Sequence, residues 1–83
     1  MYLAEVFVYL RPSIQDPQGV VIENTLKKLG FSSLDRVRTG KYFQLSLSSA
    51  SEDEARRDAE KMCRDLLSNT VIEDFRVSVR PAS

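Results

Sequence analysis

The chain has 83 residues, in which twelve Lys and Arg balance twelve Asp and Glu, and 42% of the residues are hydrophobic. This length predicts one domain spanning residues 1–83, and the composition is typical of a packed globular chain, not a disordered one. The zero net charge gives no general attraction to nucleic acid, acidic membranes or other polyanions. We therefore expect neither nucleic acid nor a membrane among its partners.

The residues available for chemistry are few. There is no histidine and only one cysteine, Cys63, so neither an internal disulfide nor a His/Cys zinc site can form. Cys63 lies on the apolar face of a predicted helix, which favours a buried structural thiol. The three glycines are too widely spaced for a phosphate loop. We predict no catalytic, cofactor-binding or metal-binding residue on this chain.

The opening run, residues 2–10, alternates as a strand does. One face carries Ala4, Val6, Val8 and Leu10, and the other carries Leu3, Glu5, Phe7 and Tyr9. The run is too short for a membrane span and does not resemble a signal peptide. Together with the single cysteine, this favours a soluble protein of the reducing cytoplasm.

A helix is predicted to start at Asp16-Pro17, with Asp16 as its N-cap and Pro17 at the first helical position. Gly30 stands where a left-handed residue would end this helix. Phe31 follows it, in the position that often makes a hydrophobic contact with the end of the helix.

Residues 34–48 predict two strands joined by a turn at residues 39–41. Phe43, Leu45 and Leu47 alternate with polar residues in the second strand, while the first, at residues 34–38, has a weaker pattern. A single strand with a bulge at Gly40 is the alternative.

A second helix begins with a capping box formed by Ser51 and Glu54 and ends near Asn69. Its predicted apolar face comprises Ala55, Ala59, Met62, Cys63 and Leu66. A last strand follows, with Phe75, Val77 and Val79 facing inward. The element order predicts an α+β, ferredoxin-like βαββαβ sandwich, in which two helices cover one face of an antiparallel four-stranded sheet.

Phe7, Tyr9 and Tyr42 are expected on the opposite face of this sheet, and these aromatic residues are poor ones to leave together in water. The other residues expected on that face are Glu5, Gln44, Ser46, Arg76 and Ser78. We interpret the face as a self-association surface, giving a dimer or higher oligomer. RNA-recognition domains also use aromatic residues there, but the neutral charge and the incomplete aromatic motif disfavour RNA. A stand-alone small-ligand-binding module and an RNA-binding module remain the alternatives.

Four segments carry a family resemblance. They are VFVYLRPSIQ leading into DPQG (residues 6–19), LKKLGF (26–31), VRTGKYFQL (37–45) and MCRDLLSNTVIEDF (62–75). Together they resemble PurS, the small subunit of phosphoribosylformylglycinamidine (FGAM) synthase, over nearly the whole chain. The departures are mild: Ser68 replaces a usual alanine and Phe75 a common tyrosine.

The resemblance implies a part in purine biosynthesis. The complex converts formylglycinamide ribonucleotide, glutamine and ATP into FGAM, glutamate, ADP and phosphate. A glutaminase subunit releases ammonia, and a large synthetase subunit consumes it with ATP and Mg. The small subunit joins these two partners and assists ammonia transfer, and the resemblance implies no cofactor on the small subunit itself.

Two segments are candidates for docking those partners. Gln18 and Gly19 are not needed for capping. Glycine in the first turn of a helix costs up to about 1 kcal/mol relative to alanine, which suggests either a close backbone approach or another local constraint. Arg38 and Lys41 flank Gly40 at the expected turn. We hypothesise a docking surface of Gln18, Gly19, Arg38, Lys41 and Tyr42. The alternative is that these residues only shape a helix start and a turn.

Overall fold

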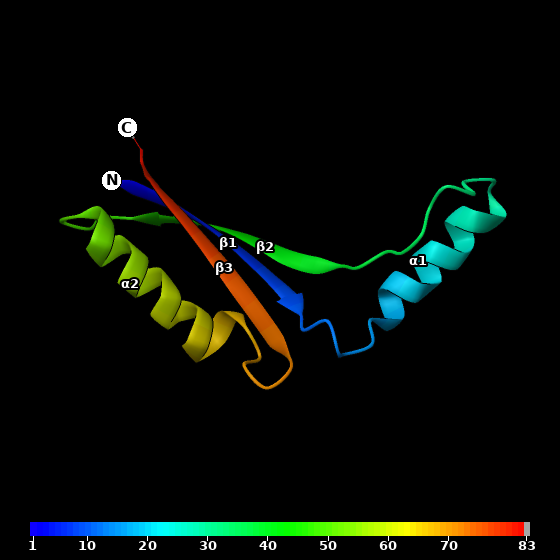
Figure 1. Ribbon diagram of the computed structural model, residues 1–83. Helices are drawn as coiled ribbons and strands as arrows, with labels where there is room; N and C mark the ends of the chain where they lie inside the picture. The colour runs from blue at the N-terminus through cyan, green and yellow to red at the C-terminus, as the bar shows by residue number, and fades with distance from the viewer. Residues whose placement is uncertain (83) are drawn as a thin grey trace.

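The computed structural model describes residues 1–82 and contains one antiparallel sheet. Its strands are β1 (Tyr2–Leu10), β2 (Gly40–Leu47) and β3 (Glu73–Pro81), in the order β2-β1-β3. The helices are α1 (Pro17–Lys28) and α2 (Glu52–Met62), and α2 continues into a π-helical turn, η1 (Cys63–Leu67). Figure 1 shows α2 along the sheet and α1 held apart from it at the other end of the molecule.

The core lies between the sheet and α2. Ala4, Val6 and Val8 of the central strand are buried, as their alternation predicted. They pack in two adjoining clusters with Ala55 and Ala59 of α2 and with Cys63, which is fully buried as expected. The small side chains on α2 allow the helix backbone to approach the sheet closely, so α2 packs directly on β1 and β3.

The pairing register fixes which residues share the open face. Phe7 of β1 stands opposite Tyr42 of β2 and Arg76 of β3, and Glu5 stands opposite Gln44 on β2. Because side chains alternate across a strand, these residues project away from the face that α2 covers.

The predicted four-stranded sheet is wrong, because residues 34–38 form no strand. The amide of Val37 donates to Glu23 Oε1 at 3.2 Å and that of Thr39 to Asp16 Oδ2 at 2.6 Å. Since side-chain carboxylates take these donors, the segment returns along α1 instead of pairing with a strand. The predicted turn at residues 39–41 is also absent: β2 begins at Gly40, and its register with β1 is unbroken.

The expectation that two helices cover one face is wrong as well. Only α2 packs along the sheet, whereas α1 and its return segment form a projecting arm (Figure 1). The molecule is consequently elongated, with extents of 50 × 30 × 14 Å. Its radius of gyration of 16.2 Å exceeds the roughly 12 Å expected for a compact chain of this length.

The predicted apolar face of the second helix holds at Ala55, Ala59 and Cys63 and fails at Met62 and Leu66. Leu66 is 83% exposed and Met62 is also exposed, contrary to the prediction. The reason is η1, in which the amide of Ser68 donates to the carbonyl of Cys63 at 2.9 Å. This wider turn shifts the helical register, so that Leu67 packs against the core in place of Leu66.

The helix caps follow the sequence closely. Ser51 Oγ accepts from the amide of Glu54 at 3.2 Å, while the Glu54 carboxylate bonds the amide of Ala50, one residue earlier than a capping box requires. Gly30 adopts a φ of 103°, and the amide of Phe31 donates to the carbonyl of Leu26, which completes a Schellman ending for α1. The Phe31 ring nevertheless stays 57% exposed, so its expected hydrophobic contact is at most partial.

Candidate partner interface

Asp16 holds the base of the arm. Its carboxylate accepts from the amide of Gly19 at 2.9 Å, from the amide of Thr39 at 2.6 Å and from Thr39 Oγ1 at 2.9 Å. These hydrogen bonds to the ionised form, above all the one from the Thr39 amide, lower the pKa of Asp16. One buried side chain therefore joins the start of α1 to the residue that precedes β2.

Gly19 faces the backbone of the return segment. A Cβ atom at this position would lie 2.4 Å from the carbonyl oxygen of Val37, and Gly19 itself is buried. The close backbone approach expected from the sequence is thus confirmed, and its partner lies within the chain. The neighbouring Glu23 carboxylate accepts from Lys27 and from the Val37 amide, and both bonds lower the pKa of Glu23.

The open sheet face is a connected network of polar and aromatic groups. The ring centres of Phe7 and Tyr42 lie 5.1 Å apart, and the Arg76 guanidinium carbon lies 4.8 Å from the centre of the Phe7 ring. The Tyr42 hydroxyl donates to Glu5 Oε2 at 2.5 Å and accepts from Gln44 Nε2 at 3.0 Å. The hydrogen bond to the Glu5 carboxylate raises the pKa of Tyr42, so this hydroxyl stays protonated at neutral pH.

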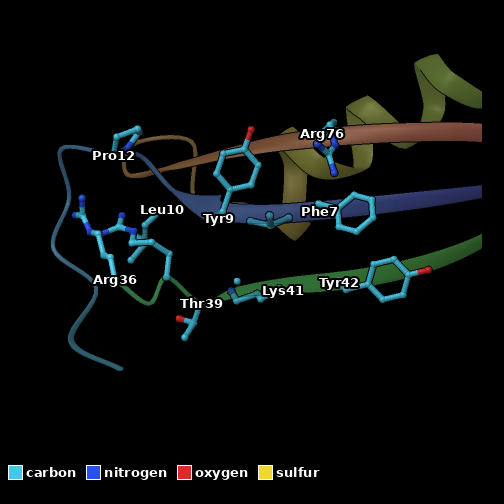
Figure 2. A pocket seen from close by; sticks show the side chains of 12 residues that line it. Phe7, Tyr9, Leu10, Pro12, Arg36, Thr39, Lys41, Tyr42 and Arg76 are labelled. Atoms are coloured by element: carbon cyan, nitrogen blue, oxygen red, sulfur yellow. The ribbon is translucent and has the colours of Figure 1, made fainter. Parts of the chain in front are cut away.

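A hollow of about 640 Å³ lies where the open face meets the return segment (Figure 2). Arg38, Lys41 and Tyr42 border it, together with Phe7 and Tyr9. A second hollow of about 400 Å³ has Gln18 and Lys41 on its rim. The structure therefore brings four of the five predicted docking residues to two hollows that share Lys41, whereas Gly19 is buried and lines neither hollow.

Two cations of the larger hollow, Arg36 and Arg76, were not among the predicted docking residues. Alternation in the last strand placed Arg76 on the open face, but it gave no reason to single this residue out. Arg36 had no usable signal, because it lies in the segment that was expected to pair as a strand.

Other kinds of site have little support in the part of the chain that the structure describes. Between residues 1 and 82, no group of three His, Cys, Asp or Glu side chains could hold a metal ion. In the same range, no helix is both long and apolar enough to cross a membrane. Burial raises the pKa of the Cys63 thiol, which disfavours the reactive thiolate.

A three-stranded sheet with one open polar and aromatic face, a helical arm and adjoining hollows defines a small α+β binding subunit. A family model described as PurS, phosphoribosylformylglycinamidine (FGAM) synthase, matches residues 3–81. The chain belongs to this PurS family.

Individual relatives agree with the family match. The chain is 40% identical over 74 residues to the phosphoribosylformylglycinamidine synthase subunit PurS of Synechocystis, covering 89% of this chain and 74% of that one. It superimposes on the crystal structure of Methanocaldococcus jannaschii PurS with a TM-score of 0.92, 31% identity and complete coverage of both chains. It also matches a chain in the structure of PurLQS from Thermotoga maritima, with a TM-score of 0.86, 26% identity, and coverage of 96% and 99%.

Proposed function

We propose that this chain is the non-catalytic PurS subunit of FGAM synthase, which joins the glutaminase subunit to the ATP-dependent synthetase subunit and assists ammonia transfer in the cytoplasm. The family match over residues 3–81 carries the assignment, and the Thermotoga relative was solved as part of PurLQS. On this proposal the complex uses ATP and Mg, and this chain itself binds no catalytic cofactor.

The exposed area supports a role that depends on partners. The accessible surface is 5883 Å², whereas about 5,000 Å² is expected for a compact monomer of 9.4 kDa. The excess of roughly 900 Å² is close to the area of about 800 Å² that one partner loses in a stable interface. The projecting arm is the main source of this excess, since it leaves both α1 and the sheet open.

Self-association is part of the proposal, and two surfaces are candidates for it. The open sheet face, with Phe7, Tyr9, Tyr42 and Gln44, is the one that the sequence suggested. The arm is the stronger candidate, because Val21 and Leu29 on it are 64% and 69% exposed, while Tyr42 on the sheet face already contacts the Phe7 ring and hydrogen-bonds to Glu5.

The occupant that suits the arm is a second copy of this chain. Each copy offers an apolar groove of about 390 Å³ beside α2, lined by Leu45, Met62, Leu66 and Leu67. Two copies that exchange their arms would cover α1 and this groove together, in the two-fold manner that most homodimers use.

Docking of the other subunits is proposed for the end of the sheet near the base of the arm. Gln18, Arg38, Lys41 and Tyr42 border the two hollows there, and Gly19 shapes the backbone at the start of α1. Arg38 donates to the carbonyls of Arg11 and Ile14, so it also supports the loop that leads into the arm.

The test is to replace Gln18 and Lys41 together by alanine and to measure glutamine-dependent FGAM synthesis in the reconstituted complex. We expect a folded variant whose activity falls at stoichiometric concentration and recovers with excess subunit. The matched control is Glu52→Ala with Arg57→Ala on the exposed side of α2, which we expect to leave activity unchanged. Full activity of the folded Gln18/Lys41 variant at stoichiometric concentration would move the docking surface elsewhere.

A further inference from the structure

The larger hollow has a charge that the chain as a whole does not have. Four cations line it, Arg36, Arg38, Lys41 and Arg76, and no carboxylate is among its lining residues. The whole chain has equal numbers of acidic and basic residues. The concentration of positive charge is therefore local, and it coincides with a concave surface, where anions are attracted most strongly.

Two of these cations have no carboxylate within ion-pair distance. Within residues 1–82, Arg36 makes no ion pair and no side-chain hydrogen bond, although its charge helps to lower the pKa of Glu23, and Arg76 only lies over the Phe7 ring. Arg38 donates to two neutral carbonyl groups, and its charge is partly offset by the Asp16 carboxylate, whose pKa it helps to lower. Lys41 Nζ lies 3.9 Å from Glu73, so its charge is partly offset.

The hollow also offers a ring surface beside the charges. Tyr9 stands opposite Gly40 in the β1–β2 register, so no side chain on β2 covers its ring on that side. Figure 2 shows Tyr9 projecting from β1 between Arg36 on the return segment and Arg76 on β3. An exposed aromatic ring flanked by cations suits a ligand with a flat ring at one end and phosphate at the other.

We propose that this hollow binds a mononucleotide, with its phosphates on Arg36 and Arg38 and its base against Tyr9. The volume of about 640 Å³ lies within the range usual for small-molecule sites. Arginine is well suited to phosphate, since its planar guanidinium can donate two hydrogen bonds to one phosphate group. The ligand is a bound effector and takes part in no chemical step on this chain. The role in FGAM synthase is not a premise of this proposal, but both proposals use Arg38 and Lys41, so a docked subunit and a bound nucleotide would compete for this hollow.

The experiment is calorimetric titration of the full chain with ADP, with pyrophosphate and with adenosine. We expect ADP to bind more tightly than either fragment, because only ADP engages both the cations and the ring. Arg36→Gln should lower the affinity for both ADP and pyrophosphate by about tenfold. Tyr9→Ala should lower the affinity for ADP and leave the affinity for pyrophosphate unchanged. The matched control, Arg57→Gln on the exposed side of α2, should change neither.

Three outcomes would contradict the proposed nucleotide site. The first is that the folded chain does not bind ADP, and the second is that Arg36→Gln and Arg57→Gln lose the same amount of ADP affinity. The third is that the chain binds ADP and pyrophosphate with equal affinity. Binding of a partner subunit that depends on Arg36 and Arg76, without any ADP binding, would assign the hollow to an acidic protein segment instead. Because the titration uses the isolated chain, its failure is separate from failure of the docking experiment, which measures activity of the complex.

Discussion

The backbone around position 19 requires glycine there, because the carbonyl oxygen of Val37 occupies the space that a side chain would need. Gly19→Ala should lower the free energy of unfolding by about 1–3 kcal/mol, since one of the two rigid backbones must shift. Gln18→Ala is the matched control on the same helical turn, where the side chain is exposed, and should stay within about 0.5 kcal/mol of wild type. Urea unfolding followed by circular dichroism measures both, and equal stability of the two variants would contradict the contact.

Asp16 gives the molecule a pH dependence of known sign. Its pKa in the folded chain lies below the ordinary value of 3.8, so its ionised form stabilises the fold above that value. This contribution is lost as the pH falls through the lowered pKa of the folded state. Asp16→Asn should therefore melt at a lower temperature than wild type at pH 7, and the gap should narrow below about pH 4.

Thermal unfolding at pH 7, 5, 4 and 3 checks this prediction. The pKa of Glu23 is lowered too, so wild type and variant should both lose stability in acid, and only their difference reports on Asp16. A gap between the two melting temperatures that stays constant over this range would show that the Asp16 carboxylate contributes nothing to the arm.

At the scale of elements, the sequence was informative wherever the contacts are local. The alternation of β1, the N-caps at Asp16 and Ser51 and the left-handed Gly30 were all predicted, since each depends on residues within one or two turns. Residues 34–38 were misread because Leu34 and Val37 are apolar enough to suggest a strand. What decides their structure is the capture of amides by Asp16 and Glu23, which lie 14 to 23 residues away.

The candidate site shows the same limit. Tyr42 and Phe7 could be placed together from alternation alone, and the register confirms that they pair. The hollow could not be predicted, because it depends on where the return segment runs relative to β1. The helical spacing of Val21, Ile22, Leu26 and Leu29 likewise predicts an apolar stripe on α1. It does not tell whether this stripe packs on its own sheet or on that of another chain.

At the scale of the whole molecule, the elongated shape and the excess surface lead to a prediction about oligomeric state. We expect light scattering at micromolar concentration to give a dimer, because a single chain would leave Val21 and Leu29 on its arm, and Leu66 in its groove, exposed to water. Leu29→Ser on the arm and Leu66→Ser in the groove should each weaken dimerisation by about tenfold or more, since burying a leucine contributes about 1.5–3 kcal/mol.

The matched control is Val71→Ser, which replaces a 77% exposed apolar residue outside both the arm and the groove. It should leave the dimer intact. A monomeric wild type at micromolar concentration, or equal behaviour of the Leu29 and Val71 variants, would remove the arm from the interface. Dissociation by Phe7→Ser with no effect from Leu29→Ser would place the contact on the open sheet face instead. That result would also leave little room for a nucleotide in the larger hollow, because Phe7 and Tyr42 border both.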